Sequence, residues 1–393
     1  METTFKTSYI DGASVNIIGD DGFTYDVFFY DNSNDELIHR EQLRCGYWTK
    51  TSRKYFTNWK IIILKNGVEV FLEELNLNNK VVKIILESNA LGDNIGWVPY
   101  CEEFRKKHNC ELIVETKLYE FFKPYYDKIT WKGLTETNSN DDNTYATYSI
   151  GVGINSSVHQ EYMKKLNQNF QKGINIKYAP DLTFFDTDRH PEHPLLFPLQ
   201  KTSSNILGLE FKEIRPNFDN ASEERPIEKK YICISEFSSS LGMKEWNNQI
   251  GWKTLIPELK KLGYEIVSIS KEKSDIKNIT KRNGDYPLSD RIWYLKHCEF
   301  FIGLCSGLSW LSWSVGKKTI MIGGFTEDWY EFQEDCIRVK NYNACTGCFN
   351  SKEHADKLCC YHGTFCPENK NFECSRKISP KMVIEKLKEN NLI

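Results

Sequence analysis

The chain contains a regular alternation of predicted strands and helices between residues 230 and 324, and this alternation restricts the fold more than any other feature. The strands are the apolar runs KYICIS, YEIVSIS, EFFIGL and KTIMIGG, and the helices are GWKTLIPELKKLG, LSDRIWYLKHC and GLSWLSWSVG. Such alternation is typical of a parallel sheet that helices cover on both faces. We therefore predict a doubly wound α/β domain over residues 226–340.

A second α/β domain is predicted over residues 81–225. The continuous apolar run KVVKIILES is typical of a parallel strand that is buried on both faces, and a helical pattern and the strand ELIVET follow it. Ligands of open α/β sheets bind beyond the carboxyl ends of the strands. Two such domains joined by a linker therefore predict a ligand cleft between them.

The two ends of the chain differ from this α/β part. Residues 1–80 contain short runs such as TYDVFFYD and VEVFLEEL, separated by turn dipeptides, which predict a small β-rich domain. Residues 341–376 form a cysteine-rich segment, and residues 377–393 are predicted to form a helix. A length of 393 residues is consistent with two or three hydrophobic cores.

The charge balance and the start of the chain exclude some partners. With 51 basic and 54 acidic residues the chain has no global basic field, so we expect no nucleic-acid partner. No apolar run reaches the roughly 18 residues that a membrane span needs. The start METTFKTSYIDGASVN lacks the charged and then apolar pattern of a secretory signal. We therefore expect a cytoplasmic protein without a membrane span.

Six of the thirteen cysteines lie between residues 345 and 374. Disulfides are rare in the cytoplasm, so this cluster predicts a metal site. A tetrahedral thiolate site needs four ligands and suits zinc or iron. No neighbouring residue indicates an open catalytic position, which favours a structural role. The expected ligands are Cys345 and Cys348 of the CTGC pair, Cys374, and either Cys360 or Cys366, with Cys359 less favoured.

Asp93 lies in the segment LGDNIGW, which follows the buried strand and opens a predicted helix. A carboxylate at the carboxyl end of a strand, facing a cleft, could act as a general base. An aspartate just ahead of a helix is also a common N-cap. The residues alone leave both interpretations open.

Two loops of the domain at 226–340 could bind phosphate groups. Ser306 and Gly307 lie between a strand and a helix, where free backbone N–H groups hold phosphates, although a serine there is also an ordinary helix cap. Lys244, in the loop SEFSSSLGMKEWNNQIGW, could neutralise a diphosphate leaving group, although a single loop lysine is commonly just solvated. The spacing of Leu308 and Trp310 is more typical of core packing.

Five segments occur in the order and context of a known family. The segments LGDNIGW, YATYSIGVG, KEWNNQIGW, FFIGLCSGLSWLSW, and CTGC followed by FEC together resemble the bacterial autotransporter heptosyltransferases. More distantly, the second half resembles the lipopolysaccharide-core heptosyltransferases. The resemblance implies a GT-B fold, meaning two Rossmann-like domains facing a cleft, preceded by a small β-domain. It also implies an ADP-heptose donor, a serine or threonine hydroxyl of an adhesin as acceptor, and inversion at the sugar carbon.

The resemblance further implies roles for individual residues. Asp93 would take the proton of the acceptor hydroxyl, and Lys244 would neutralise the ADP diphosphate. Ser306, Gly307 and Leu308 would lie at the donor phosphates. The other donor-site residues that it implies are Ser268, Ser270 and Lys271 beside the adenosine, and Trp246 and Asn247 at the donor cleft.

In this family the cysteine segment binds iron through four cysteines as a brace, and the proteins form large homo-oligomeric rings. The chain departs from the family pattern, because Cys360 precedes the sequence HGT whereas Cys366 precedes Pro367. In family members these two features mark a single cysteine. The alignment of DKLC and HGT favours Cys360 as the fourth ligand, with Cys366 as the alternative.

Two other functions remain open on the sequence. One is a GT-B transferase that uses another nucleotide sugar or a lipopolysaccharide acceptor, and the other is a non-enzymatic scaffold that binds a nucleotide sugar. Turnover of ADP-heptose would separate the main hypothesis from a transferase that uses UDP- or GDP-sugars, and the effect of Asp93→Asn on glycosylation would separate it from the scaffold.

Overall fold

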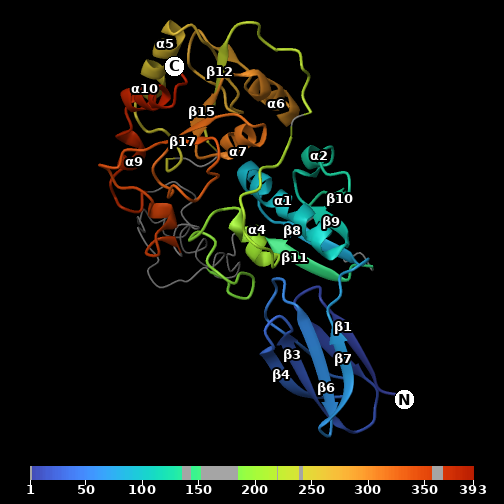
Figure 1. Ribbon diagram of the computed structural model, residues 1–393. Coiled ribbons are helices and arrows are strands. Elements are labelled where there is room, and N and C mark those ends of the chain that lie inside the picture. The colour runs from blue at the N-terminus through green and yellow to red at the C-terminus, as the bar shows by residue number, and fades with distance from the viewer. Residues whose placement is uncertain (1, 135–142, 152–184, 219, 239–241, 356–365) are drawn as a thin grey trace, which may run out of the picture.

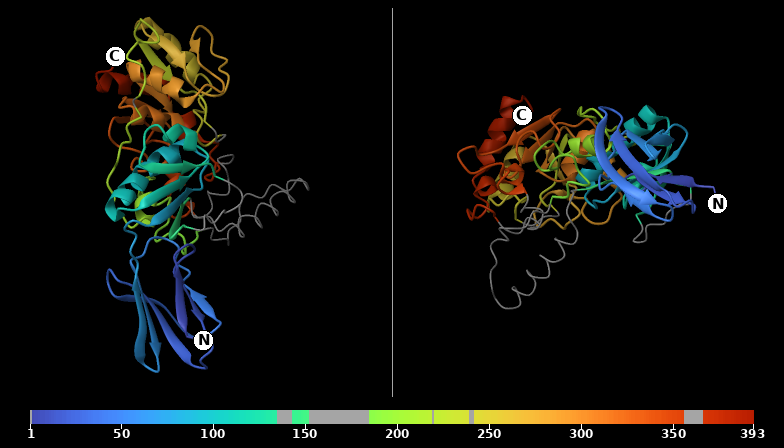
Figure 2. Two further views of the ribbon diagram at one scale, coloured as in Figure 1. Left: turned by 90° about the vertical axis from the view of Figure 1, so that its right-hand side faces the viewer. Right: turned by 90° about the horizontal axis from the view of Figure 1, so that it is seen from below.

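The computed structural model describes residues 2–134, 143–151, 185–218, 220–238, 242–355 and 366–393. It confirms an α/β fold with parallel sheets, and two antiparallel sheets lie near the N-terminus. Figures 1 and 2 show the antiparallel sheets at one end of an elongated molecule and the six-stranded parallel sheet at the other, with the four-stranded parallel sheet between them. No helix within the described ranges is both long and apolar enough to cross a bilayer.

The six-stranded sheet is parallel throughout and has the strand order of a doubly wound fold. Ile232 and Ile234 belong to the core cluster of α5 and α10, whereas Tyr231 and Cys233 belong to that of α6 and α7. Helices therefore cover both faces, as predicted. The strands in spatial order are β14 (Thr280–Lys281), β13 (Glu265–Ser268), β12 (Tyr231–Ile234), β15 (Phe301–Leu304), β16 (Thr319–Ile322) and β17 (Cys336–Val339). The helices are α5 (Gly251–Lys261), α6 (Leu288–His297), α7 (Gly307–Ser314) and α10 (Pro380–Glu389).

The four-stranded parallel sheet carries the long helix α1 (Leu91–His108) between its strands β8 and β9. The helix ends where Asn109 adopts a left-handed backbone (φ 48°), which lets the chain turn back into β9. The side chains of Trp97 and Phe104 are fully buried in the core. The spatial order of the sheet is β10 (Ile129–Lys132), β9 (Glu111–Glu115), β8 (Val81–Leu86) and β11 (Ala146–Ile150), and two short helices accompany it, α2 (Tyr119–Phe122) and α4 (Lys201–Ile206).

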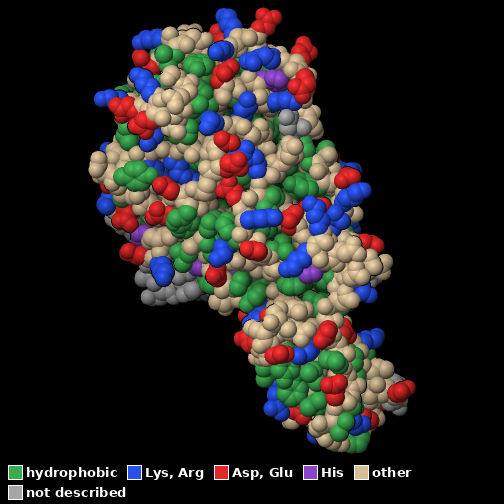
Figure 3. All heavy atoms as spheres, in the orientation of Figure 1, with side chains coloured by type: hydrophobic (Ala, Val, Ile, Leu, Met, Phe, Trp, Pro, Cys, Tyr) green, Lys and Arg blue, Asp and Glu red, His purple; other side chains and the backbone are tan. Residues whose placement is uncertain are grey.

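The N-terminal strands alternate buried and exposed side chains, as expected for antiparallel sheets. Phe29 and Ile61, for example, are fully buried. Figure 3 shows hydrophobic side chains on the outer surface of this part. Among the exposed residues, Val68 is 66% and Leu72 is 51% exposed. The polar strands β1, β4 and β5 were not predicted. One sheet has the order β1 (Thr4–Ser8), β2 (Ser14–Ile18), β5 (Trp48–Lys50), and the other the order β4 (Glu36–Arg44), β3 (Thr24–Asp31), β6 (Trp59–Lys65), β7 (Val68–Glu74).

The first turns of α1 and α7 approach each other through two glycines. A Cβ atom on Gly307 would lie 2.7 Å from the Cβ of Leu91 and 3.0 Å from the backbone nitrogen of Gly92. A Cβ atom on Gly92 would lie 2.9 Å from Cδ1 of Trp310. These spaces are too small for a side chain, so the approach requires glycine at both positions. Because α1 belongs to one parallel sheet and α7 to the other, the contact sets the relative position of the two α/β units.

We expect Gly307→Ala to lower the free energy of unfolding by about 1–3 kcal/mol, because the added methyl group overlaps atoms that cannot rotate away. Urea unfolding of the purified chain measures this change. Gly133→Ala is a matched control, because its Cβ would meet only the ring of Tyr119, at 3.3 Å. Equal stability of the two variants would contradict the role given to the glycine contact.

Candidate active site

A cavity of about 620 Å³ lies between the two α/β units. The start of α1 forms one side, and loops that follow β12, β13, β15 and β16 form the other. These loops leave the carboxyl ends of parallel strands, which is where a ligand cleft was predicted. The predicted site residues that line the cavity are Asp93, Lys244, Lys271, Ser306, Gly307 and Leu308.

Asp93 is the third residue of α1. The N-cap of this helix is Ala90, and no side chain caps it, so the capping interpretation of Asp93 is wrong. Instead, Oγ of Ser88 donates a hydrogen bond of 2.5 Å to Oδ2 of Asp93. Loss of hydration raises the pKa of Asp93, and the Ser88 bond and the charge of Lys244 oppose this only in part. A carboxylate with a raised pKa is a stronger proton acceptor.

Lys244 reaches the cavity from the loop after β12. Its amine forms no ion pair within the part of the chain that the structure describes, so its charge is available to a ligand. The loop is held at two points. Oε1 of Glu245 accepts a hydrogen bond from the backbone of Ser238 (3.2 Å), and Nδ2 of Asn247 donates one to Oγ of Ser375 (2.8 Å). The loop that carries the cation is therefore anchored.

Ser306 occupies the N-cap position of α7, but its side chain makes no capping bond. Its Oγ is buried and has no hydrogen-bond partner among the described residues. The first N–H groups of any helix have no partner within the helix, and here Gly307 and Leu308 supply them at the cavity wall. An unpartnered hydroxyl beside free N–H groups is an arrangement that suits a phosphate.

Four residues predicted for the donor site do not line the cavity, and we correct their roles. Trp246 is buried, and its Nε1 donates a hydrogen bond to the backbone oxygen of Ile378 (2.9 Å). Asn247 anchors the Lys244 loop. The remaining two, Ser268 and Ser270, are fully buried and donate hydrogen bonds of 2.8 and 3.1 Å to the carboxylate of Glu236. All four support cavity loops from behind, because their side chains face the interior.

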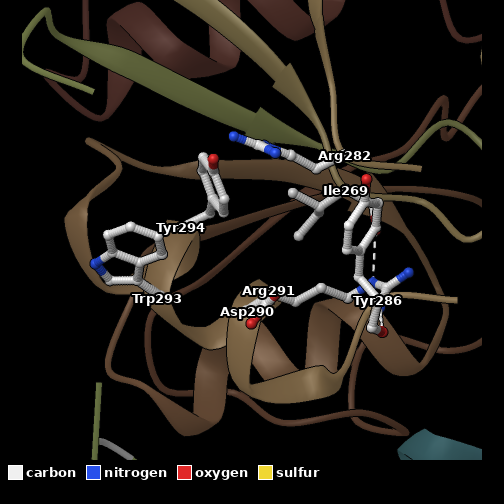
Figure 4. A pocket seen from close by; sticks show the side chains of 7 residues that line it. All are labelled: Ile269, Arg282, Tyr286, Asp290, Arg291, Trp293 and Tyr294. Carbon is white, nitrogen blue, oxygen red and sulfur yellow. Dashed lines mark hydrogen bonds between the residues drawn. The ribbon is translucent and has the colours of Figure 1, made fainter. Parts of the chain in front are cut away.

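The loop at residues 284–286 lines the cavity and was not predicted. The guanidinium of Arg291, on α6, donates hydrogen bonds to three backbone carbonyls, including those of Gly284 (2.8 Å) and Tyr286. Figure 4 shows Arg291 beside Tyr286 at a smaller pocket of about 100 Å³. Both residues line the large cavity as well, so the loop separates the two spaces.

Tyr330 and Glu331 also line the cavity and were missed. They come from the irregular segment between β16 and β17, which has no periodic pattern. Burial raises the pKa of Tyr330, and the charge of Asp93 raises it further. Tyr330 and Asp93 line the same cavity.

The predicted metal ligands are only partly described, because Cys360 lies outside the described residues. The backbone nitrogen of Cys345 donates a hydrogen bond to Oε1 of Glu373 (3.3 Å), which ties the CTGC turn to α9 (Glu373–Arg376), the helix that carries Cys374. Burial, and then neighbouring thiols that include Cys366, raise the pKa of Cys348 to about 12. Among the described residues, no three His, Cys, Asp or Glu side chains are arranged to hold a metal ion. The metal site therefore stays a prediction.

No protein-family model matches the sequence. The chain is 31% identical over 372 residues to the autotransporter heptosyltransferase Aah of Escherichia coli, a match that covers 90% of this chain and 85% of Aah. A crystal structure of TibC, described as a dodecameric iron-containing heptosyltransferase in complex with ADP-D-β-D-heptose, matches with a TM-score of 0.80. That match has 26% identity and covers 99% of this chain and 96% of TibC. The chain is also 27% identical over 369 residues to BimC of Burkholderia thailandensis, which is named an inactive autotransporter heptosyltransferase; this match covers 90% of this chain and 78% of BimC.

We expect Lys244→Gln to weaken the affinity for ADP about 10- to 100-fold, because a hydrogen bond to a charged group contributes about 1.5–3 kcal/mol. Calorimetric titration of the full chain measures the dissociation constant. Lys253→Gln, on the exposed surface of α5, is the matched control. An unchanged affinity in Lys244→Gln would show that the amine does not face the diphosphate.

Proposed function

The chain belongs to the autotransporter heptosyltransferases, and on this premise we propose that it transfers heptose from ADP-heptose to hydroxyl groups of an autotransporter adhesin. The observation that supports the proposal most directly is that Asp93, Lys244 and Ser306 line one cavity. A base, a cation and a phosphate-binding helix start are the groups that such a transfer needs. Because one relative is named inactive, this arrangement carries more weight than the similarity alone.

The donor would bind with its diphosphate at the start of α7. The N–H groups there and the hydroxyl of Ser306 would bind phosphate oxygens, and Lys244 would approach them from the loop after β12. Lys271 also lines the cavity and pairs with Asp285 (2.8 Å), and we assign it to the nucleoside end of the donor. When the bond between the sugar and the diphosphate breaks, negative charge grows on the leaving oxygen. The amine and the helix start stabilise this charge.

The acceptor would be a serine or threonine hydroxyl of the adhesin, which makes the reaction a protein O-glycosylation. Asp93 takes the proton of this hydroxyl while its oxygen forms a bond to the anomeric carbon of the heptose. The electron pair of the broken carbon–oxygen bond leaves with ADP. A single displacement of this kind inverts the anomeric configuration and needs no covalent intermediate.

The finer organisation is also part of the proposal. We assign a β-rich domain to residues 1–80, the two halves of a GT-B fold to residues 81–225 and 226–340, a metal-binding finger to residues 341–376, and a final helix to residues 377–393. The proposal includes a cytoplasmic location. Dodecameric TibC supports a homo-oligomer, for which we propose a ring.

Iron is the proposed metal of the finger, with zinc as the alternative, and iron-containing TibC supports it. Cys345, Cys348 and Cys374, together with Cys360 or Cys366, would hold the ion. Soft thiolate donors suit iron. The bound ion would brace the finger, and no step of the transfer passes through it.

We expect Asp93→Asn to slow heptose transfer by roughly 10²- to 10⁴-fold, because an amide cannot take the acceptor proton. Intact-mass analysis of a co-expressed adhesin measures the added heptose, and Asp127→Asn, an exposed position outside the cavity, is the control. Transfer by the wild type should also decline as the pH falls, because a protonated Asp93 cannot act as a base. Since the pKa of Asp93 is raised, this decline should begin at a higher pH than an exposed aspartate would give. Undiminished transfer by Asp93→Asn would show that Asp93 is not the base.

Elemental analysis of the purified chain should find iron, and Cys348→Ser should lose it. Either Cys360→Ser or Cys366→Ser should lose the metal as well, which would identify the fourth ligand. Cys45→Ser, in the N-terminal part, should retain it. Retention of iron by both Cys360→Ser and Cys366→Ser would contradict a four-thiolate site.

A further inference from the structure

Glu331 is a buried carboxylate in the wall of the cavity. The residue is 5% exposed and lines the cavity from the segment between β16 and β17. Its Oε2 accepts hydrogen bonds from Nη1 of Arg338 (2.8 Å) and from Oγ1 of Thr326 (3.2 Å). None of the residues that the structure describes bonds to Oε1. This oxygen is therefore available to a ligand in the cavity.

Arg338, on β17, offsets the cost of burying this charge. Burial alone would lower the pKa of Arg338, but the charge of Glu331 reverses the effect and raises it. Replacing a buried ion pair by apolar side chains of similar volume is often neutral or stabilising. Stability therefore does not explain an ion pair at this position. A carboxylate that lines a cavity and has one uncommitted oxygen points to a role in binding.

The position of Glu331 indicates which part of a bound donor its carboxylate would contact. Glu331 follows Tyr330, which lines the same cavity as the proposed base Asp93. Thr326, its hydrogen-bond partner, lies 3.8 Å from Sγ of Cys305, the residue directly before the proposed phosphate site. The carboxylate is thus near the reacting end of the cavity. A diphosphate would be repelled by its charge, whereas neutral hydroxyl groups would donate hydrogen bonds to it.

We propose that Glu331 is a specificity-determining residue whose Oε1 accepts hydrogen bonds from hydroxyl groups of the heptosyl part of the donor. The inference rests on the proposed function and deepens it, because it names the group that recognises the sugar. Arg338 and Thr326 fix the orientation of the carboxylate, so it favours hydroxyls at one position. A buried site built to bind a hydroxyl discriminates strongly against analogues that lack it.

Glu331→Gln tests the inference through two affinities of the full chain, measured by calorimetry for ADP-heptose and for ADP. The affinity for ADP-heptose should fall about 10- to 100-fold, because a hydrogen bond to a charged group is lost, while the affinity for ADP should stay unchanged. Glu334→Gln, an exposed position on the same segment, is the matched control. An equal loss for both ligands would indicate a merely structural role. That result, or an unchanged affinity for ADP-heptose, would overturn the inference.

A second variant is needed because Glu331→Gln leaves Arg338 without its charged partner, which could impair folding. The double variant Glu331→Leu, Arg338→Met removes both charges and should keep the unfolding temperature of the wild type. It should show the same selective loss of affinity for ADP-heptose. If the double variant instead binds ADP-heptose as tightly as the wild type, the role of Glu331 is refuted. If the wild-type chain binds neither ADP-heptose nor ADP, the proposed function itself fails. Wild-type binding combined with an unaffected Glu331→Gln variant refutes only the inference.

Discussion

The contact between the first turn of α1 and the first turn of α7 determines the geometry of the whole site. Gly92 and Gly307 let the two helices approach without intervening side chains, and each helix carries one functional group at that point. Asp93 comes from α1, and Ser306 precedes α7. The proposed base and the phosphate-binding helix start belong to different domains, and this approach brings them to one cavity. The positive ends of both helix dipoles also converge there, which favours a negatively charged ligand.

The charges in the cavity divide it into regions of different chemistry. Lys244, the start of α7 and Ser306 form the part that suits a diphosphate. Asp93 lies at the border of this part, where burial raises its pKa while Lys244 limits the rise. Glu331, held by Arg338, also lines the cavity, and its uncommitted oxygen suits neutral hydroxyl groups. The same cavity can therefore orient a donor that has an anionic end and a neutral, hydroxyl-rich end.

Much of the fold could be predicted because its central strands are short apolar runs. Strands β12, β15 and β16 are buried along their whole length, so their sequences are mostly apolar. Short or polar strands such as β1 and β14 have no such pattern and were missed. Asp93, Ser306 and Lys244 could be found because each lies just after a strand of a parallel sheet, where topology alone brings side chains toward a ligand.

The rest of the site depends on contacts that sequence proximity does not reveal. Trp246 is two residues from Lys244, yet its indole faces the opposite side of the loop and supports it. Ser268 and Ser270 lie at the end of a strand, but their hydroxyls bind Glu236 in the interior. Glu331 lies in an irregular segment and is held by Arg338 on β17, so no local pattern could have indicated it. The family resemblance predicted Trp246, Ser268 and Ser270 for the donor site but could not predict the orientation of their side chains.

The central claim is a single displacement in which Asp93 activates the acceptor while the pyrophosphate is held at α7. The anomeric configuration of the transferred heptose tests this claim most directly. Nuclear magnetic resonance of a glycosylated adhesin peptide, made with a donor of defined configuration, determines it. The account predicts that the product has the configuration opposite to that of the donor. A product that retains the donor configuration would contradict it, because a single displacement from the opposite face of the sugar cannot retain the configuration.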